Sequence, residues 1–187
     1  MKNLVLIIVF LNLEISAFTQ VNVMAPLHVM VYNNPSVEED QDWTELDKYL
    51  HYANSVGVKA ISVDVWWGLV QEGGKDTFDW SYYKKLFEHI KSNNLQIIPI
   101  MSFHQCGGNV NDNYTKRLPS WIWEQLKSDA GVNDVNQFKY VSPRASCDEY
   151  ISLWIDKYVL PYYSRFISEF IKTFNDYHTA IPEINIS

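Results

Sequence analysis

The sequence predicts an α/β fold built on a parallel β-sheet. Apolar runs of strand length alternate with longer segments whose apolar residues recur at helical spacing. Their order, β-α-β-α-β-α-β, is typical of a parallel sheet with right-handed crossovers. Polar loops directly follow the second and third runs. Because ligands of α/β proteins bind at the carboxyl ends of the strands, these loops are where a functional site is expected.

The first strand is expected within Val21–Val31, although Pro26 has no N–H to donate to a ladder. Asp42, with Glu45 three residues later, resembles a capping box and predicts the start of the first helix. Gly57 should end this helix, as glycines commonly do. Its apolar face is predicted from helical spacing to contain Leu46, Leu50, Ala53 and Val56.

Two continuous apolar runs predict the second and third strands, at Ala60–Val65 and Ile97–Phe103. Runs rich in β-branched residues and bounded by turn signals are typical of buried strands in a parallel sheet. A loop from Trp66 to Asp76 precedes a helix that Asp79 can cap. The apolar positions of this helix are Tyr83, Leu86, Phe87 and Ile90.

After the third strand, Pro119 at a first-turn position predicts a short helix at Ser120–Ser128. The segment from Asn133 to Arg144 is interpreted as irregular or hairpin-like. A long helix is expected from Asp148 to Tyr177, and Pro161 should kink or divide it. A fourth strand is expected at Ile181–Ser187.

Composition restricts the class of protein. The length of 187 residues fits one domain or part of a larger one, and a net charge of −7 without a basic run argues against nucleic acid or an anionic membrane as partner. The seven Trp and twelve Tyr can form a core or line a carbohydrate site, and the Trp66–Trp67 pair is interpreted as packing. Residues 1–19 have the charged and apolar regions of a signal peptide, so 20–187 would be the secreted, folded part. Spacing does not decide whether Cys106 and Cys147 pair.

The stretch Met101–Asp112 is the strongest candidate for a binding site. An apolar strand ends there in a polar loop containing Gly107 and Gly108, residues that suit a tight turn or a closing loop. The polar side chains that would line a pocket are His104, Gln105, Asn109 and Asp112. An ordinary surface loop is the alternative.

Three motifs in order resemble the β-amylase family, glycoside hydrolase family 14. The motifs are Val63–Gly68, Phe78–Tyr83 and Ser102–Asp112, and the similarity extends through Leu118–Trp121 to Glu183–Ser187. The resemblance implies a (β/α)8 TIM barrel, of which this chain would supply about the first four β/α units. It also implies inverting hydrolysis of α-1,4-glucans such as starch or glycogen, with release of maltose from non-reducing ends and without a metal or other cofactor.

The resemblance assigns sugar contacts to Asp64, His104 and Asp112, and it makes Cys106 a thiol near the site that is not the nucleophile. It implies a lid loop formed by Gly107, Gly108, Asn109 and Val110. From the residues alone, Asp64 could instead form an internal cap or ion pair. A nucleophilic or metal-binding pair of His104 and Cys106 also stays open, although it would need an orienting third group or more ligands.

The residues that perform the hydrolysis are expected elsewhere. Inversion needs a carboxylic acid and a second carboxylate roughly 6.5–9.5 Å apart, and the family supplies two glutamates that are expected beyond Ser187, the first in a Gly-Glu-Leu-Arg-Tyr-like segment. Glu183, inside the fourth strand, is assigned to barrel packing or an internal hydrogen bond. Asp64 and Asp112 could serve as their own acid and base, but the family uses them to hold substrate. The sequence thus predicts a truncated β-amylase that is inactive alone, with a non-catalytic α-glucan-binding protein or the product of a truncated gene model as alternatives.

Overall fold

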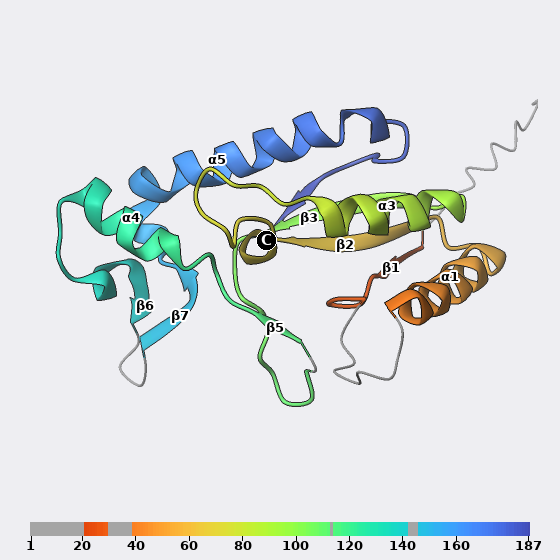
Figure 1. Ribbon diagram of the computed structural model, residues 1–187, viewed down its shortest axis with the longest axis horizontal. Helices are drawn as coiled ribbons and strands as arrows, with labels where there is room; N and C mark the ends of the chain where they lie inside the picture. The colour runs from red at the N-terminus through yellow and green to blue at the C-terminus, as the bar shows by residue number, and fades with distance from the viewer. Residues whose placement is uncertain (1–20, 30–38, 113, 142–145) are drawn as a thin grey trace, which may run out of the picture.

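The computed structural model describes residues 21–29, 39–112, 114–141 and 146–187 (Figure 1). The predicted signal peptide at 1–19 lies outside these residues. None of the helices in the described ranges is long and apolar enough to span a membrane.

A four-stranded parallel sheet forms the centre of the fold (Figure 1). Its strands are β1 (Asn22–Met24), β2 (Ala60–Trp66), β3 (Gln96–Ser102) and β8 (Asn185–Ile186), in the spatial order β1-β2-β3-β8. The pairing of β2 with β3 runs along both strands without a register shift, from Ala60 opposite Gln96 to Trp66 opposite Ser102. The predicted parallel α/β sheet is therefore confirmed.

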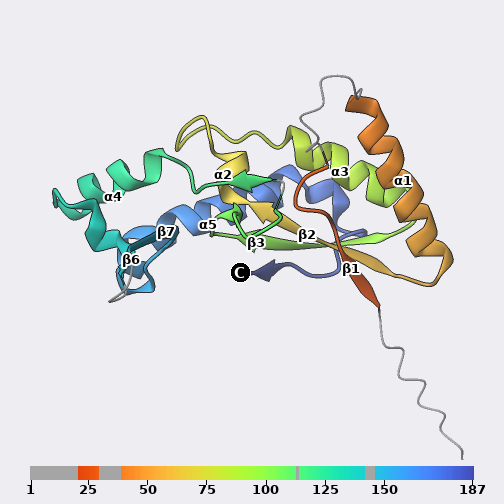
Figure 2. The same ribbon diagram turned by 90° about the horizontal axis from the view of Figure 1, so that it is seen from below.

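Helices lie along one face of this sheet and beyond the carboxyl ends of its strands (Figures 1 and 2). They are α1 (Glu39–Ser55), α2 (Trp67–Val70), α3 (Ser81–Ser92), α4 (Trp121–Ala130) and α5 (Asp156–Thr173), with single 3-10 turns η1 (Val135–Phe138), η2 (Leu153–Ile155) and η3 (Asn175–Tyr177). Two antiparallel pairs complete the fold, β4 (Cys106–Gly107) with β5 (Thr115–Lys116) and β6 (Lys139–Val141) with β7 (Ser146–Ile151). Both figures show α4 and the β6–β7 hairpin at the opposite end of the molecule from α1.

The alternation of side chains along β2 explains the two faces of the sheet. Ile61, Val63 and Val65 point to the helices and are buried, together with the buried positions of α3 and α5. Ser62 and Asp64 point to the other face and stay partly exposed. One face thus supplies the hydrophobic core, and the other can present polar groups.

The amino-terminal elements differ from the prediction in their limits. Strand β1 ends at Met24, and Ala25 adds one further hydrogen bond from its N–H to the carbonyl of Ser62. Helix α1 begins at Glu39, so the capping box predicted at Asp42 is wrong. Gly57 ends this helical segment as expected, with φ of 92°.

On the predicted apolar face of α1, Leu46 and Leu50 are buried, but Val56 lies beyond the helix and is 59% exposed. The Asp79 carboxylate accepts a hydrogen bond from the Ser81 N–H at the start of α3, but Trp80 rather than Asp79 directly precedes this helix, so the predicted cap is confirmed only in part. Hydrogen bonds from the side chain and then the backbone of Ser81 lower the pKa of Asp79. Trp66 and Trp67 are both buried, which confirms their interpretation as packing residues.

The carboxyl-terminal part shows three further differences. The helix predicted from Asp148 begins only at Asp156, because residues 146–151 pair with 139–141 as the second strand of the expected hairpin. Pro161 does not divide α5, which continues to Thr173. Glu183 is exposed and lies before β8, so its predicted place inside the fourth strand is wrong; its carboxylate accepts a long hydrogen bond of 3.5 Å from Asn185, in line with the predicted alternative of an internal hydrogen bond.

Candidate functional site

The carboxyl ends of β2 and β3 bring Asp64 and Ser102 together. Asp64 lies opposite Ile100 in the register, and Ser102 follows two residues later on the same face of the sheet. The Ser102 hydroxyl donates to Asp64 Oδ1 over 2.7 Å. Ser102 is completely buried, while Asp64 is partly exposed. The Asp64 carboxylate is therefore held by a buried hydroxyl of the neighbouring strand, and Asp64 is still partly exposed to solvent.

Tyr83 of α3 fixes the backbone at the same strand end. In the described residues, strand β1 pairs with β2 as far as Ser62, and the next backbone groups on that edge, the carbonyl of Asp64 and the N–H of Trp66, have no strand partner among them. The Tyr83 hydroxyl accepts from the Trp66 N–H at 2.7 Å and donates to the Asp64 carbonyl at 3.0 Å. A buried side chain thus takes the place of the missing strand.

His104 follows β3, and its ring meets the edge of Trp66 with centroids 5.2 Å apart. Its Nδ1 lies 3.0 Å from the carbonyl oxygen of Gln105. Since a carbonyl only accepts, Nδ1 must carry the proton, and in the neutral ring Nε2 is then an acceptor. Nε2 is 3.2 Å from the Ser187 hydroxyl, at the end of the neighbouring β8. The site therefore presents an imidazole nitrogen that can accept from a hydroxyl.

The loop that carries Asp112 begins and ends in the two-residue ladder of β4 and β5. Gly107, with φ of 63°, has to be glycine because a Cβ would overlap the carbonyl oxygen of Tyr114. At the tip, the Asp112 carboxylate accepts from the Asn109 N–H at 2.8 Å and closes a tight turn. Val110 in this turn is 91% exposed, so the predicted lid residues project from the surface.

Aromatic stacking anchors the same loop to the body of the protein. The Tyr114 ring stacks on His28 with centroids 4.5 Å apart, and His28 stacks on Tyr82 of α3 at 4.2 Å. The loop base is therefore held by both a backbone ladder and a stack of three rings, while among the described residues the tip is held by its own turn.

Cys106 is buried and forms part of β4, at the base of the loop that carries Asp112. Burial raises the pKa of its thiol to about 12, and the negative charges of Asp64 and Asp112 contribute to the increase. The thiol is therefore protonated at neutral pH and a poor nucleophile. Both ring nitrogens of His104 have other partners, and Cys106 and Cys147 are free thiols, so the His104–Cys106 nucleophilic pair is not formed.

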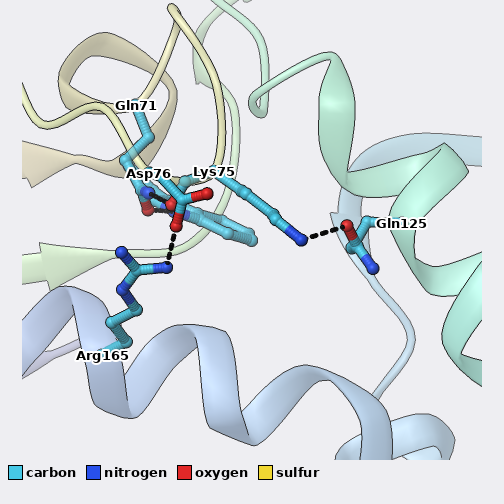
Figure 3. A network of polar contacts seen from close by, with 6 residues as sticks. Gln71, Lys75, Asp76, Gln125 and Arg165 are labelled. Atoms are coloured by element: carbon cyan, nitrogen blue, oxygen red, sulfur yellow. Dashed lines mark hydrogen bonds and ion pairs between the residues drawn. The ribbon is translucent and has the colours of Figure 1, made fainter.

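A network of polar contacts fixes the loop between β2 and α3 (Figure 3). The buried Gln71 side chain accepts from the indole N–H of Trp67 at 2.6 Å and donates to the carbonyl of Lys75 at 2.8 Å. The Gln71 carbonyl accepts from the indole N–H of Trp121 at 2.8 Å. One glutamine thus ties the loop to α2 and α4.

The outer part of this network joins the loop to the two carboxyl-terminal helices (Figure 3). Lys75 donates to the side-chain oxygen of Gln125 in α4 at 3.1 Å, and Arg165 of α5 pairs with Asp76 at 2.6 Å. Because these groups are exposed, they contribute little stability. Their effect is to hold the loop in one position beside the strand ends.

The site can hold hydroxyl groups, since it offers two carboxylates and an imidazole acceptor at neighbouring strand ends. Sequence reasoning identified these three residues but missed Ser102 and Tyr83. Side chains alternate along a strand, so Ser102, two residues after Ile100, could have been placed on the same face of the sheet as Ile100. Tyr83 was assigned to the core, where its ring does lie, but no pattern in the sequence indicates the partners of its hydroxyl. In the described ranges, no three His, Cys, Asp or Glu side chains gather as a metal site.

The chain is similar to known proteins over nearly all of its length. The profile of glycosyl hydrolase family 14 matches residues 22–187. A β-amylase of Niallia circulans is 36% identical over 90% of this chain and 26% of its own length, and a thermophilic β-amylase of Thermoanaerobacterium thermosulfurigenes is 33% identical over 96% of this chain and 30% of its own length. The solved catalytic domain of the Paenibacillus polymyxa β-amylase superposes with a TM-score of 0.72 at 32% identity, covering 90% of this chain and 36% of that one. The chain spans about a third or less of the curated relatives cited here.

Proposed function

Because this chain belongs to glycosyl hydrolase family 14, we propose that it forms the part of a β-amylase that holds an α-1,4-glucan during the release of maltose. One observation supports this most directly. Asp64 lies near the carboxyl end of β2, His104 follows β3, and Asp112 lies in the loop between β4 and β5, on a chain whose similarity to β-amylases covers these positions.

Each residue has a distinct task in this proposal. Asp64 accepts a hydrogen bond from a sugar hydroxyl at Oδ2, since Oδ1 already accepts one from Ser102. His104 accepts through Nε2 when a sugar hydroxyl replaces the Ser187 hydroxyl, which lies 3.2 Å from this nitrogen. Asp112 follows Gly107–Val110 in the loop between β4 and β5 and reaches the sugar when this loop closes, which also excludes water.

Holding the substrate is separate from cleaving it. The Asp64 and Asp112 carboxylates are both engaged as hydrogen-bond acceptors, which suits them to binding. The inverting acid and base are therefore assigned to the family's two glutamates, in polypeptide outside residues 1–187. The same polypeptide would supply the remaining β/α units and cover the outer edges of β1 and β8. By this assignment the 187 residues bind glucan but do not turn it over.

Calorimetric titration with maltose, together with a maltose-release assay on maltodextrin, tests the proposal. Asp64→Asn and His104→Ala should each weaken binding about tenfold, equal to about 1.4 kcal/mol. The matched control is Asp176→Asn, because Asp176 lies in η3, which precedes β8, and this variant should leave maltose binding unchanged. If maltose binds equally to all four proteins, the assigned residues are wrong. Appreciable maltose release by the 187 residues would refute the assignment of the acid and base.

A second candidate is a non-catalytic α-glucan-binding protein, favoured by the engagement of both site carboxylates as acceptors. It requires that the whole natural protein bind maltose and release none from maltodextrin. A transcript that stops at Ser187 would favour this candidate or the product of a truncated gene, and one that continues in a Gly-Glu-Leu-Arg-like frame would favour the enzyme. We also propose secretion directed by residues 1–19, which amino-terminal sequencing of the mature protein tests.

A further inference from the structure

We propose that Ser102 is a positioning residue, whose buried hydroxyl holds the Asp64 carboxylate in the orientation that binds sugar. The inference rests on the proposed function, because it needs Asp64 to contact the glucan. It adds a residue that has no sugar contact of its own.

The geometry assigns the single hydroxyl proton of Ser102 to Asp64. The hydroxyl oxygen lies 2.7 Å from Asp64 Oδ1 and 3.1 Å from the carbonyl of Ile100. A hydroxyl has only one proton to donate, and the shorter contact is to the charged group, where hydrogen bonds are stronger. Because Ser102 is completely buried, water does not replace this donor if it is removed.

The rest of the strand end is already fixed, so the side-chain torsions of Asp64 are the freedom that remains. Tyr83 holds the Asp64 carbonyl, and the β2–β3 register fixes the direction of its Cα–Cβ bond. The carboxylate is partly exposed and would otherwise rotate among rotamers. A bond from Ser102 to Oδ1 selects one rotamer before the sugar arrives, which lowers the ordering cost of binding.

Asp112 provides a contrast that supports this reading. Its carboxylate is bonded to the Asn109 N–H of its own exposed turn, so its position moves with the loop. The donor to Asp64 comes instead from the neighbouring strand of the central sheet. The site therefore combines one carboxylate on a rigid frame with one on a closing segment, and Ser102 accounts for the rigid one.

A double-mutant cycle on the full natural protein, with maltose as the probe, tests the inference. Ser102→Ala should weaken maltose binding about tenfold in the natural background and less than about twofold in an Asp64→Ala background, because the serine then has nothing to position. Ser62→Ala is the matched control, a serine two residues before Asp64 on the same strand and face, and should leave binding unchanged. Ser102→Cys, which keeps a side chain but donates weakly, replaces the alanine variant if that variant does not fold.

The outcomes separate this inference from the proposed function. If Asp64→Ala weakens binding but Ser102→Ala causes the same loss in both backgrounds, Ser102 is merely structural and the inference fails alone. If Asp64→Ala binds maltose as well as the natural protein does, or if the natural protein binds none, the sugar contact of Asp64 and the inference both fail. An effect of Ser102→Ala that requires Asp64 confirms both.

Discussion

Replacing Tyr83 by phenylalanine should destabilise the protein by removing one oxygen atom. The ring would keep its buried position, since Tyr83 is completely buried and packs on Phe87 and Trp80. The lost hydroxyl, however, bonds the Trp66 N–H at 2.7 Å and the Asp64 carbonyl at 3.0 Å. Beyond the end of β1, none of the strands that the structure describes pairs with this edge of β2 and could accept a hydrogen bond from the N–H instead.

The magnitude follows from the environment of the two backbone groups. A buried polar group left without its partner costs about 1–3 kcal/mol. The Trp66 N–H lies in a residue that is only 4% exposed and should incur this cost, whereas the carbonyl of the partly exposed Asp64 can be hydrated in part. We therefore expect a loss of about 2 kcal/mol in the free energy of unfolding, or about 4–8 °C in Tm.

Urea-induced unfolding followed by tryptophan fluorescence measures this loss, and hydrogen exchange locates it. The Trp66 amide should exchange faster in Tyr83→Phe, while the amides of β2 that pair with β3 should keep their relative protection. Tyr52→Phe is the control, because Tyr52 is 66% exposed and its hydroxyl is in water. If both variants lose less than about 0.5 kcal/mol, the Tyr83 hydroxyl does not replace a strand and the reasoning is wrong.

Two further predictions concern the loop and the thiol. Gly107→Ala should abolish the β4–β5 pairing and weaken maltose binding, because the new Cβ would overlap the Tyr114 carbonyl. Gly131 is the control, since its φ of 66° is similar but nothing lies near a new Cβ. Gly131→Ala should therefore lower the free energy of unfolding, measured by thermal unfolding, by only about 1 kcal/mol. Equal losses in the two variants would show that backbone strain alone matters. Burial raises the pKa of Cys106 from 9.0 to about 12, so the folded state holds this proton more tightly and stability should fall as the pH rises from about 9 to about 12. Cys106→Ala should make that fall less steep in pH-dependent urea unfolding, and an unchanged slope would contradict the raised pKa.

The sequence located the candidate site better than it described its contacts. Asp64 and His104 could be placed at strand ends because continuous apolar runs mark buried parallel strands, and polar residues follow each run. The partners of these residues were not predictable, since Ser102 and Tyr83 reach Asp64 only through strand pairing and helix packing. The hairpin at 139–151 was mistaken in part for helix because short segments near Asp148 have no decisive period, and pairing with a distant segment decides their conformation.

The sequence by itself determined the order of elements, the parallel sheet, the strand-end loops and, through its motifs, the family. These properties depend on local periodicity and residue type, which can be read along the chain. The tertiary structure alone decided which backbone and side-chain groups meet: the hydroxyl of Tyr83 with the backbone of β2 beyond the end of β1, and the hydroxyl of Ser102 with the Asp64 carboxylate. It also decided the burial that raises the pKa of the Cys106 thiol. The hydrogen bonds of Tyr83 and Ser102 join residues 17, 19 and 38 positions apart, and they arise from register and packing rather than from any local pattern.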